Sequence, residues 1–127
     1  TPLYSSAASD VYKRQILAPA IGGIVIGYEI GKLLKKETIF CERVNGKFIL
    51  RRGFNIRKGS RVLIIEDVIT TGKSSLECSK LVTDNKAVII GYACIIDRSK
   101  DNSSLEKKIV SQVKLNIPTY SENNLPI

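Results

Sequence analysis

Unbroken runs of aliphatic residues are the feature that most restricts the fold of this 127-residue chain. Residues 62–65 are Val-Leu-Ile-Ile, and residues 87–96 form a longer apolar run. Successive side chains of a β-strand point to opposite faces, so a run without polar alternation predicts a strand that is buried on both faces. Strands of this kind are typical of parallel sheets that helices cover on both sides.

Segments with helical periodicity separate these runs. The expected helices are residues 24–35, 74–82 and 105–110. The expected strands are residues 16–18, 38–41, 62–65, 87–96 and 113–117. Strands that alternate with helices predict βαβ units, so we expect an α/β fold with a parallel twisted sheet flanked by helices.

The histidine and cysteine content narrows the possible chemistry. The chain has no His, and this removes the commonest general base at neutral pH and the commonest zinc ligand. Cys41, Cys78 and Cys94 are odd in number and far apart in the sequence. We therefore expect buried, reduced thiols rather than a disulfide framework or a zinc site.

The most apolar window, residues 16–34, is not expected to cross a membrane. It contains Glu29 and Lys32, and a charge near the centre of a span costs roughly 2.5–3.5 kcal/mol. The first fifteen residues lack the apolar core of a signal peptide. These features predict a cytoplasmic protein.

The positive charge of the chain is concentrated in one window. Residues 32–61 contain ten Lys or Arg and two Glu, which together equal the net charge of +8 of the whole chain. A coat for nucleic acid would more often spread over several elements, so we consider nucleic acid an improbable ligand. A solvated basic face and a loop that binds a compact polyanion are the two remaining interpretations. Within this window, residues 43–60 are expected to form a long mobile loop or hairpin.

Residues 62–75, VLIIEDVITTGKSS, combine two acids with a possible phosphate site. Glu66 and Asp67 end the aliphatic strand, and residues 67–73 are expected to form a turn that leads into a helix near Ser74. Backbone N–H groups at a helix N-terminus bind anions, and the hydroxyls of Thr70, Thr71, Ser74 and Ser75 could donate to the same phosphate. Carboxylates repel phosphate, so they need neutral donors on the same ligand. Adjacent ribose hydroxyls meet this need, and we predict a ribose 5-phosphate ligand.

Two common nucleotide-binding motifs are excluded by their glycine spacing. A P-loop would need Gly at position 67, which is Asp, and a dinucleotide fingerprint would need Gly at position 24, which is Ile. An acidic strand end followed by an ordinary helix cap is the remaining structural interpretation.

Residues 66–74, EDVITTGKS, resemble the phosphoribosyl pyrophosphate (PRPP) motif of the type I phosphoribosyltransferases. The similarity runs from about Ile16 to the C-terminus and is strongest with the orotate branch of the family. The segments that support it are residues 18–23, 42–47, 50–54, 97–99 and 117–120. The resemblance implies a Rossmann-like phosphoribosyltransferase core over residues 16–127. Residues 1–15 match nothing in the family, so we expect them to be a leader, and we expect the family's N-terminal hood to be missing.

The resemblance also implies roles for individual residues. Glu66 and Asp67 would hold the ribose hydroxyls of PRPP, with the catalytic Asp67 closest to the reacting carbon. The other PRPP-binding residues of the motif would be Val68, Ile69, Thr70, Thr71, Gly72, Lys73 and Ser74. Thr70 and Arg98 would contact orotate, with Arg98 pairing with its carboxylate.

In this family a mobile basic loop closes over the pyrophosphate across a dimer interface. Arg43 and Lys47 match two of its cationic positions, which implies that both bind PRPP, that both act in catalysis and that the chain forms a homodimer. Mg²⁺ would be held mainly through PRPP, without a direct protein ligand. Val44, Ile49 and Gly22 stand where some members carry Lys or His, so those contacts are either absent or supplied by Arg51 or Arg52.

The implied activity is that of orotate phosphoribosyltransferase. It would transfer ribose 5-phosphate from PRPP to orotate and give orotidine 5′-monophosphate and pyrophosphate in pyrimidine (UMP) synthesis. Two alternatives remain at this point. One is a type I transferase that acts on a purine, and the other is a non-catalytic PRPP-sensing regulator that binds nucleic acid through its basic window.

Overall fold

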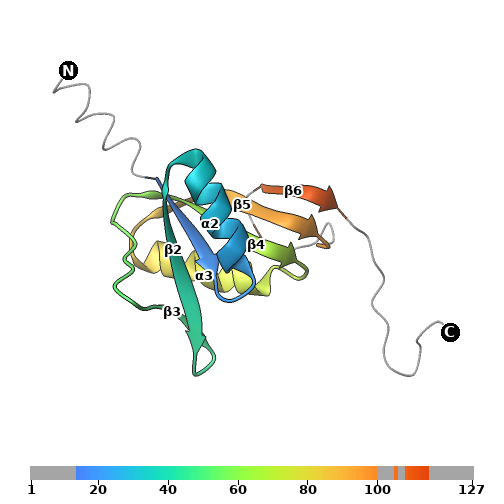
Figure 1. The fold of residues 1–127 in the computed structure, drawn as a ribbon. Helices are drawn as coiled ribbons and strands as arrows, with labels where there is room; N and C mark the ends of the chain where they lie inside the picture. The colour runs from blue at the N-terminus through green and yellow to red at the C-terminus, as the bar shows by residue number, and fades with distance from the viewer. Residues whose placement is uncertain (1–13, 100–104, 106–107, 115–127) are drawn as a thin grey trace, which may run out of the picture.

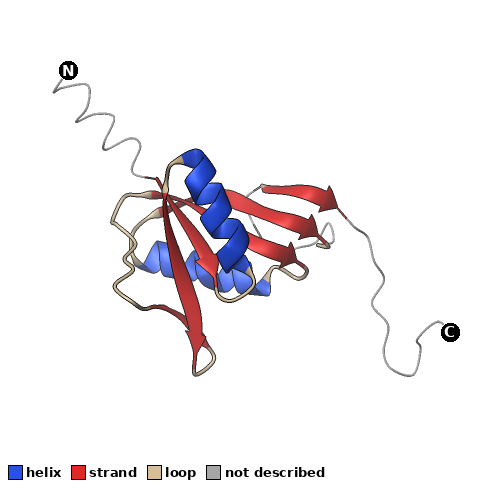
Figure 2. Cartoon of the chain, in the orientation of Figure 1, coloured by secondary structure: helices blue, strands red, loops and turns tan. Residues whose placement is uncertain are grey.

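The computed structural model describes residues 14–99, 105 and 108–114. This part of the chain forms a six-stranded sheet in the order β3-β2-β1-β4-β5-β6, with one helix on each face (Figures 1 and 2). The strands are β1 Arg14–Pro19, β2 Glu37–Val44, β3 Lys47–Leu50, β4 Arg61–Ile69, β5 Val88–Asp97 and β6 Ile109–Lys114. The helices are α2 Gly23–Leu34 and α3 Lys73–Asp84. Neither helix is long and apolar enough to cross a membrane.

The sheet is parallel apart from the β2–β3 hairpin at one edge, which is antiparallel. The expected α/β class is therefore confirmed. The crossover from β1 to β2 runs in one direction and that from β4 to β5 in the other, and right-handed connections then place their helices on opposite faces. In Figure 1, α2 lies in front of the sheet and α3 behind it. The strand order reverses between β1 and β4, and ligands bind at such switch points in open α/β sheets.

The core lies on both faces of the central strands. Leu17, Ile64 and Val62 are fully buried there. Helix α2 approaches its face closely because it turns glycines toward the sheet. A Cβ atom added to Gly27 would lie 2.7 Å from the Cβ of Ala18. The inner face of α3 consists of Ser75, Cys78, Ser79 and Val82.

Several expected boundaries are wrong. Strand β4 continues to Ile69, so residues 67–69 are strand and the turn begins only at Thr70. The expected helix 105–110 is wrong at its C-terminal end, where residues 109–110 begin β6, and Leu105 is not helical. Parallel pairing with β5 determines the conformation there, because the edge of β5 offers backbone partners that a short helix would leave unused. Strand β6 therefore begins four residues before the expected strand 113–117, and residues 115–117 lie outside the described residues.

The first strand also begins earlier than expected. Arg14 and Gln15, which the family resemblance placed in the leader, are the first two residues of β1. The remaining leader residues, 1–13, lie outside the described part of the chain.

The basic segment 43–60 consists of a hairpin and an irregular stretch. Asn45 and Gly46 link β2 to β3 with φ angles of 51° and 81°, the left-handed pair typical of a two-residue hairpin turn. The buried side chain of Gln15 holds the second half of the segment. Its Nε2 donates to the carbonyl oxygen of Asn55 at 2.9 Å, and its Oε1 accepts from the amide of Arg57 at 3.0 Å and from the Ser60 hydroxyl at 2.9 Å. Residues 55–60 are therefore tied to the central strand of the sheet.

Candidate functional site

The loop that follows β1 meets the C-terminal part of β4 at the switch point of the sheet. The amide of Ala20 donates to the carbonyl oxygen of Cys41 at 2.8 Å, which fixes the first loop to β2. A Cβ atom added to Gly22 would lie 2.7–2.9 Å from three atoms of the Asp67 carboxylate. The lack of a side chain at Gly22 thus allows Asp67 to lie directly against the first loop.

The two acids of β4 face opposite sides of the sheet, because they are neighbours on one strand. The Asp67 side chain lies on the α2 side, is exposed, and its Oδ1 accepts from the Val68 amide at 2.8 Å. Glu66 lies on the α3 side, is 7% exposed and accepts a hydrogen bond from the Ser75 hydroxyl. Burial raises the pKa of Glu66; the hydrogen bond from Ser75 opposes this shift, and the charge of Asp67 adds to it. The two acids are close together but lie in different environments.

The loop between β4 and α3 has the geometry of an anion site. Gly72 is the N-cap of α3 with φ of 83°, a left-handed conformation that glycine adopts without strain. The Thr71 hydroxyl oxygen accepts from the Lys73 amide at 3.2 Å. The amides of Ser74 and Ser75 are in the first turn, where N–H groups have no acceptor within the helix, so they point toward the loop side of α3. The expected helix start, with Gly72 before it, is confirmed.

The ends of β4 and β5 bring Thr70 and Arg98 together. Ile69 pairs in register with Asp97, and the Arg98 amide donates to the Ile69 carbonyl oxygen at 2.7 Å. The Asp97 carboxylate accepts from both the amide and the hydroxyl of Ser99, at 2.7 and 2.5 Å. The buried Nε of Arg98 has no hydrogen-bond partner among the described residues. Thr70 and Arg98 thus follow adjacent strands at one edge of the sheet, and the buried Nε of Arg98 is an unpaired donor there.

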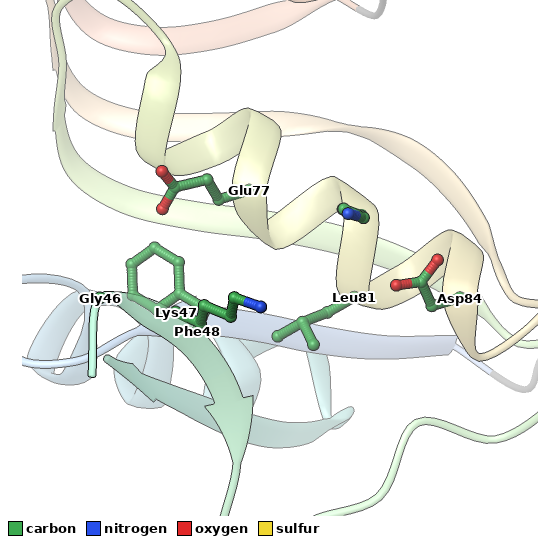
Figure 3. Close-up of a pocket in the computed structure, with 7 residues that line it drawn as sticks. Gly46, Lys47, Phe48, Glu77, Leu81 and Asp84 are labelled. Atoms are coloured by element: carbon green, nitrogen blue, oxygen red, sulfur yellow. The ribbon is translucent and has the colours of Figure 1, made fainter. Parts of the chain in front are cut away.

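Arg43 and Lys47 lie along α3 rather than beside the acids of β4. The Nη1 atom of Arg43 is 2.8 Å from Oε2 of Glu77 and donates to the Gly46 carbonyl oxygen at 3.1 Å. The guanidinium also lies over the ring of Phe48, 4.2 Å from its centroid. Lys47 lines an open groove of about 360 Å³ between the hairpin and α3, together with Glu77 and Asp84 (Figure 3). Within one copy of the described chain, these two cations face the helix that follows the motif.

Comparison with known proteins identifies the family. Residues 13–124 match the family model of the phosphoribosyl transferase domain. The chain belongs to the phosphoribosyltransferase family. The β4 acids, the Gly72 turn and the N-terminus of α3 all lie within the matched residues.

Two curated relatives are named orotate phosphoribosyltransferase. The chain is 41% identical over 111 residues to the protein of Parvibaculum lavamentivorans, an alignment that covers 87% of this chain and 57% of that protein. It is 42% identical over 123 residues to the protein of Chlorobium phaeobacteroides, with coverage of 97% and 64%. The chain thus spans about three-fifths of the length of these relatives.

A solved adenine phosphoribosyltransferase from Thermoanaerobacter pseudethanolicus has the same fold, with a TM-score of 0.70. The superposition covers 90% of this chain and 77% of that one at 16% sequence identity, so it supports the fold alone.

Sequence reasoning misplaced one residue of this phosphoribosyltransferase site and missed another. Ser75 was expected to donate to phosphate, but it is fully buried and its hydroxyl is bonded to Glu66. The helical period that places Ser75, Cys78 and Val82 on one face could have shown this. The contact between Gly22 and Asp67 had no signal in the sequence, because it joins a loop to a strand residue 45 positions away.

Among the described residues, no group of three or more His, Cys, Asp or Glu could hold a metal ion. Mg²⁺ commonly binds through one or two carboxylates together with substrate phosphates and water. Pyrophosphate oxygens and water can supply such ligands without a direct protein ligand.

Proposed function

We propose that this chain carries the PRPP site and part of the base site of an orotate phosphoribosyltransferase. The observation that supports this most directly is the position of Asp67, exposed beside Gly22 and adjacent to the anion-binding turn of α3. A carboxylate next to an anion site suits a ligand that has both a phosphate and neutral hydroxyls. The names of the two curated relatives support orotate as the acceptor.

In this proposal the loop binds the 5-phosphate of PRPP. The amide of Ser74 and the hydroxyls of Thr70 and Thr71 donate to phosphate oxygens, and the N-terminus of α3 stabilises the negative charge. Of the remaining motif residues, Val68 and Ile69 end β4, and Gly72 and Lys73 shape the turn around the phosphate. The exposed Asp67 carboxylate accepts a hydrogen bond from one hydroxyl of the ribose diol. The Glu66 carboxylate, on the other side of β4, accepts from the second hydroxyl through Oε1, the oxygen that does not bind Ser75, where the diol lies across the strand.

The base site is proposed at Thr70 and Arg98. Orotate bears a carboxylate, and a guanidinium forms paired hydrogen bonds with a carboxylate. The Nε of Arg98, a buried donor without an acceptor among the described residues, is the observation that supports this assignment. A purine lacks that carboxylate, so Arg98 favours orotate over a purine acceptor.

The reaction joins N1 of orotate to C1 of the ribose while the bond from C1 to pyrophosphate breaks. Positive charge develops on the ribose and negative charge on the departing oxygens. Asp67, at the strand end, lies where it can stabilise the ribose side, and Arg43 and Lys47 of a second copy of the chain would neutralise the pyrophosphate. A closed basic hairpin would also exclude water from the reactive carbon.

Mg²⁺ bound to the pyrophosphate supplies further charge neutralisation. This scheme requires a homodimer, and the free buried cysteines suit a cytoplasmic enzyme.

Ligand-dependent stability tests the PRPP site. We expect PRPP with Mg²⁺ to raise the free energy of unfolding by about 2.7 kcal/mol at 100 times its Kd, and ATP with Mg²⁺ to have little effect. Equal stabilisation by both would contradict a ribose 5-phosphate site. Salt-dependent binding of RNA or DNA without stabilisation by PRPP would favour a nucleic-acid function instead.

Substitution of Arg98 tests the acceptor. We expect R98A to weaken orotate binding far more than PRPP binding, because only orotate uses the guanidinium. R61A, at the exposed first residue of β4, is the matched control and is expected to leave both affinities unchanged. Equal weakening of both ligands by R98A would show that Arg98 does not bind orotate.

A further inference from the structure

A hydrogen-bonded chain lies behind the acids of β4, on the α3 side of the sheet. Ser75 donates its hydroxyl to Glu66, and its carbonyl oxygen accepts from the Ser79 hydroxyl at 2.8 Å. The Ser79 hydroxyl also pairs with the Tyr92 hydroxyl at 2.5 Å. All four residues are buried, so the chain connects β4 through α3 to β5 inside the core.

Among the described residues, no side chain other than Ser75 donates a hydrogen bond to Glu66. The ionisable groups around it are Asp67 on its own strand, Cys78 on α3 and Cys94, its register partner on β5. The hydrogen bond with Cys41, together with burial, raises the pKa of Cys78, and burial raises the pKa of Cys94 to about 11. Both thiols stay neutral at pH 7, so they offer Glu66 no countercharge. The Ser75 hydroxyl is the donor that the structure provides to this carboxylate.

We infer that Ser75 is the positioning residue of Glu66: its hydroxyl holds the buried carboxylate ionised and oriented at the end of β4, so that this acid can accept a hydrogen bond from a ribose hydroxyl. The inference rests on the proposed function for its ligand, but its physical basis does not require a ligand. A buried carboxylate that loses its donor favours the protonated form, and a protonated Glu66 accepts hydrogen bonds less well. Ser75 thus acts through Glu66 and does not touch the substrate.

The first test measures the ionisation of Glu66 without substrate. A ¹³C NMR titration of the glutamate carboxyl groups, with the Glu66 signal assigned by its loss in E66Q, compares wild type with S75A. We expect a higher pKa for Glu66 in S75A, because the bond to the charged form is lost. The control is T83A, which removes an exposed hydroxyl of the same helix that bonds to a backbone carbonyl. An unchanged or lower pKa in S75A would overturn the inference.

The second test measures PRPP affinity in the presence of Mg²⁺ as a function of pH. At pH 7 we expect S75A to bind PRPP about tenfold more weakly, the size of one lost hydrogen bond to a charged group. The difference should shrink as the pH rises and Glu66 ionises again, and E66Q/S75A should bind no more weakly than E66Q. A loss that is the same at every pH, or one that adds to that of E66Q, would indicate a merely structural role and overturn the inference.

These outcomes separate the inference from the proposed function. If wild type does not bind PRPP, the proposed function fails, while the NMR titration still decides whether Ser75 controls Glu66. If S75A does not fold, as judged by circular dichroism, S75C replaces it in both tests, because its thiol is a weaker donor of similar size.

Discussion

The close approach of Gly22 to Asp67 predicts that one added methyl group will impair the site without unfolding the protein. In G22A the new Cβ would lie 2.7–2.9 Å from the Asp67 carboxylate, well inside ordinary van der Waals contact. The carboxylate is the mobile end of an exposed side chain, so it can turn away at a conformational cost of about 0.5–1.5 kcal/mol. We therefore expect a small effect on folding and a large displacement of the acid.

The effect on binding follows from the hydrogen bonds that the acid would lose. A hydrogen bond to a charged group contributes about 1.5–3 kcal/mol, which corresponds to roughly 10- to 150-fold weaker PRPP binding. Isothermal titration calorimetry with PRPP and Mg²⁺ measures this loss, and urea unfolding measures stability separately. D67N provides the control: if Gly22 acts through Asp67, the two substitutions are not additive, and G22A/D67N binds as D67N does. Wild-type affinity in G22A, or full additivity in the double variant, would refute this reasoning.

Three further predictions concern packing and polar contacts. G27A should lower the free energy of unfolding by about 1–3 kcal/mol, because its Cβ would lie 2.7 Å from that of Ala18. In urea titrations A18G/G27A should recover part of this loss, and an unchanged midpoint in G27A would contradict the close packing of α2 on β1. Q15L should lower the free energy of unfolding by about 1–3 kcal/mol, because it leaves buried polar groups of residues 55–60 unpaired. It should also accelerate amide hydrogen exchange in residues 55–60, and wild-type exchange rates would contradict the role of Gln15. E77Q should change the free energy of unfolding by less than about 1 kcal/mol, since the ion pair with Arg43 is partly exposed. R43A/E77Q should be no less stable than R43A, and a loss of several kcal/mol in E77Q would indicate a different role for Glu77.

The fold could be predicted because its signal is local. The unbroken aliphatic runs of β4 and β5 indicated buried parallel strands, and Gly72 marked the start of α3. The errors occurred where non-local pairing decides the conformation. Strand β6 forms against the edge of β5, and β4 extends past its acids because its backbone continues to pair with β5 as far as Ile69.

The candidate site could be predicted only in part, for a related reason. The sequence pattern predicted a glycine-containing turn from the acids of β4 into a helix, and the structure has this turn before α3, since these residues are contiguous. It could not show that the two acids face opposite sides of the sheet once the strand continues through them. The role of Ser75 also depends on the rotation of α3 against β4, which only the packed structure provides.

Helix α3 contacts three parts of the molecule, so a substitution in the helix can affect all of them. Its N-terminus faces the anion-binding turn, its inner face holds Glu66, and Glu77 in its second turn binds the basic hairpin. A rigid-body tilt of α3 would therefore displace the turn, Glu66 and the hairpin together. Variants along α3 should accordingly be compared by several independent measurements. A loss of turnover alone would not show whether the turn, Glu66 or the hairpin had been displaced.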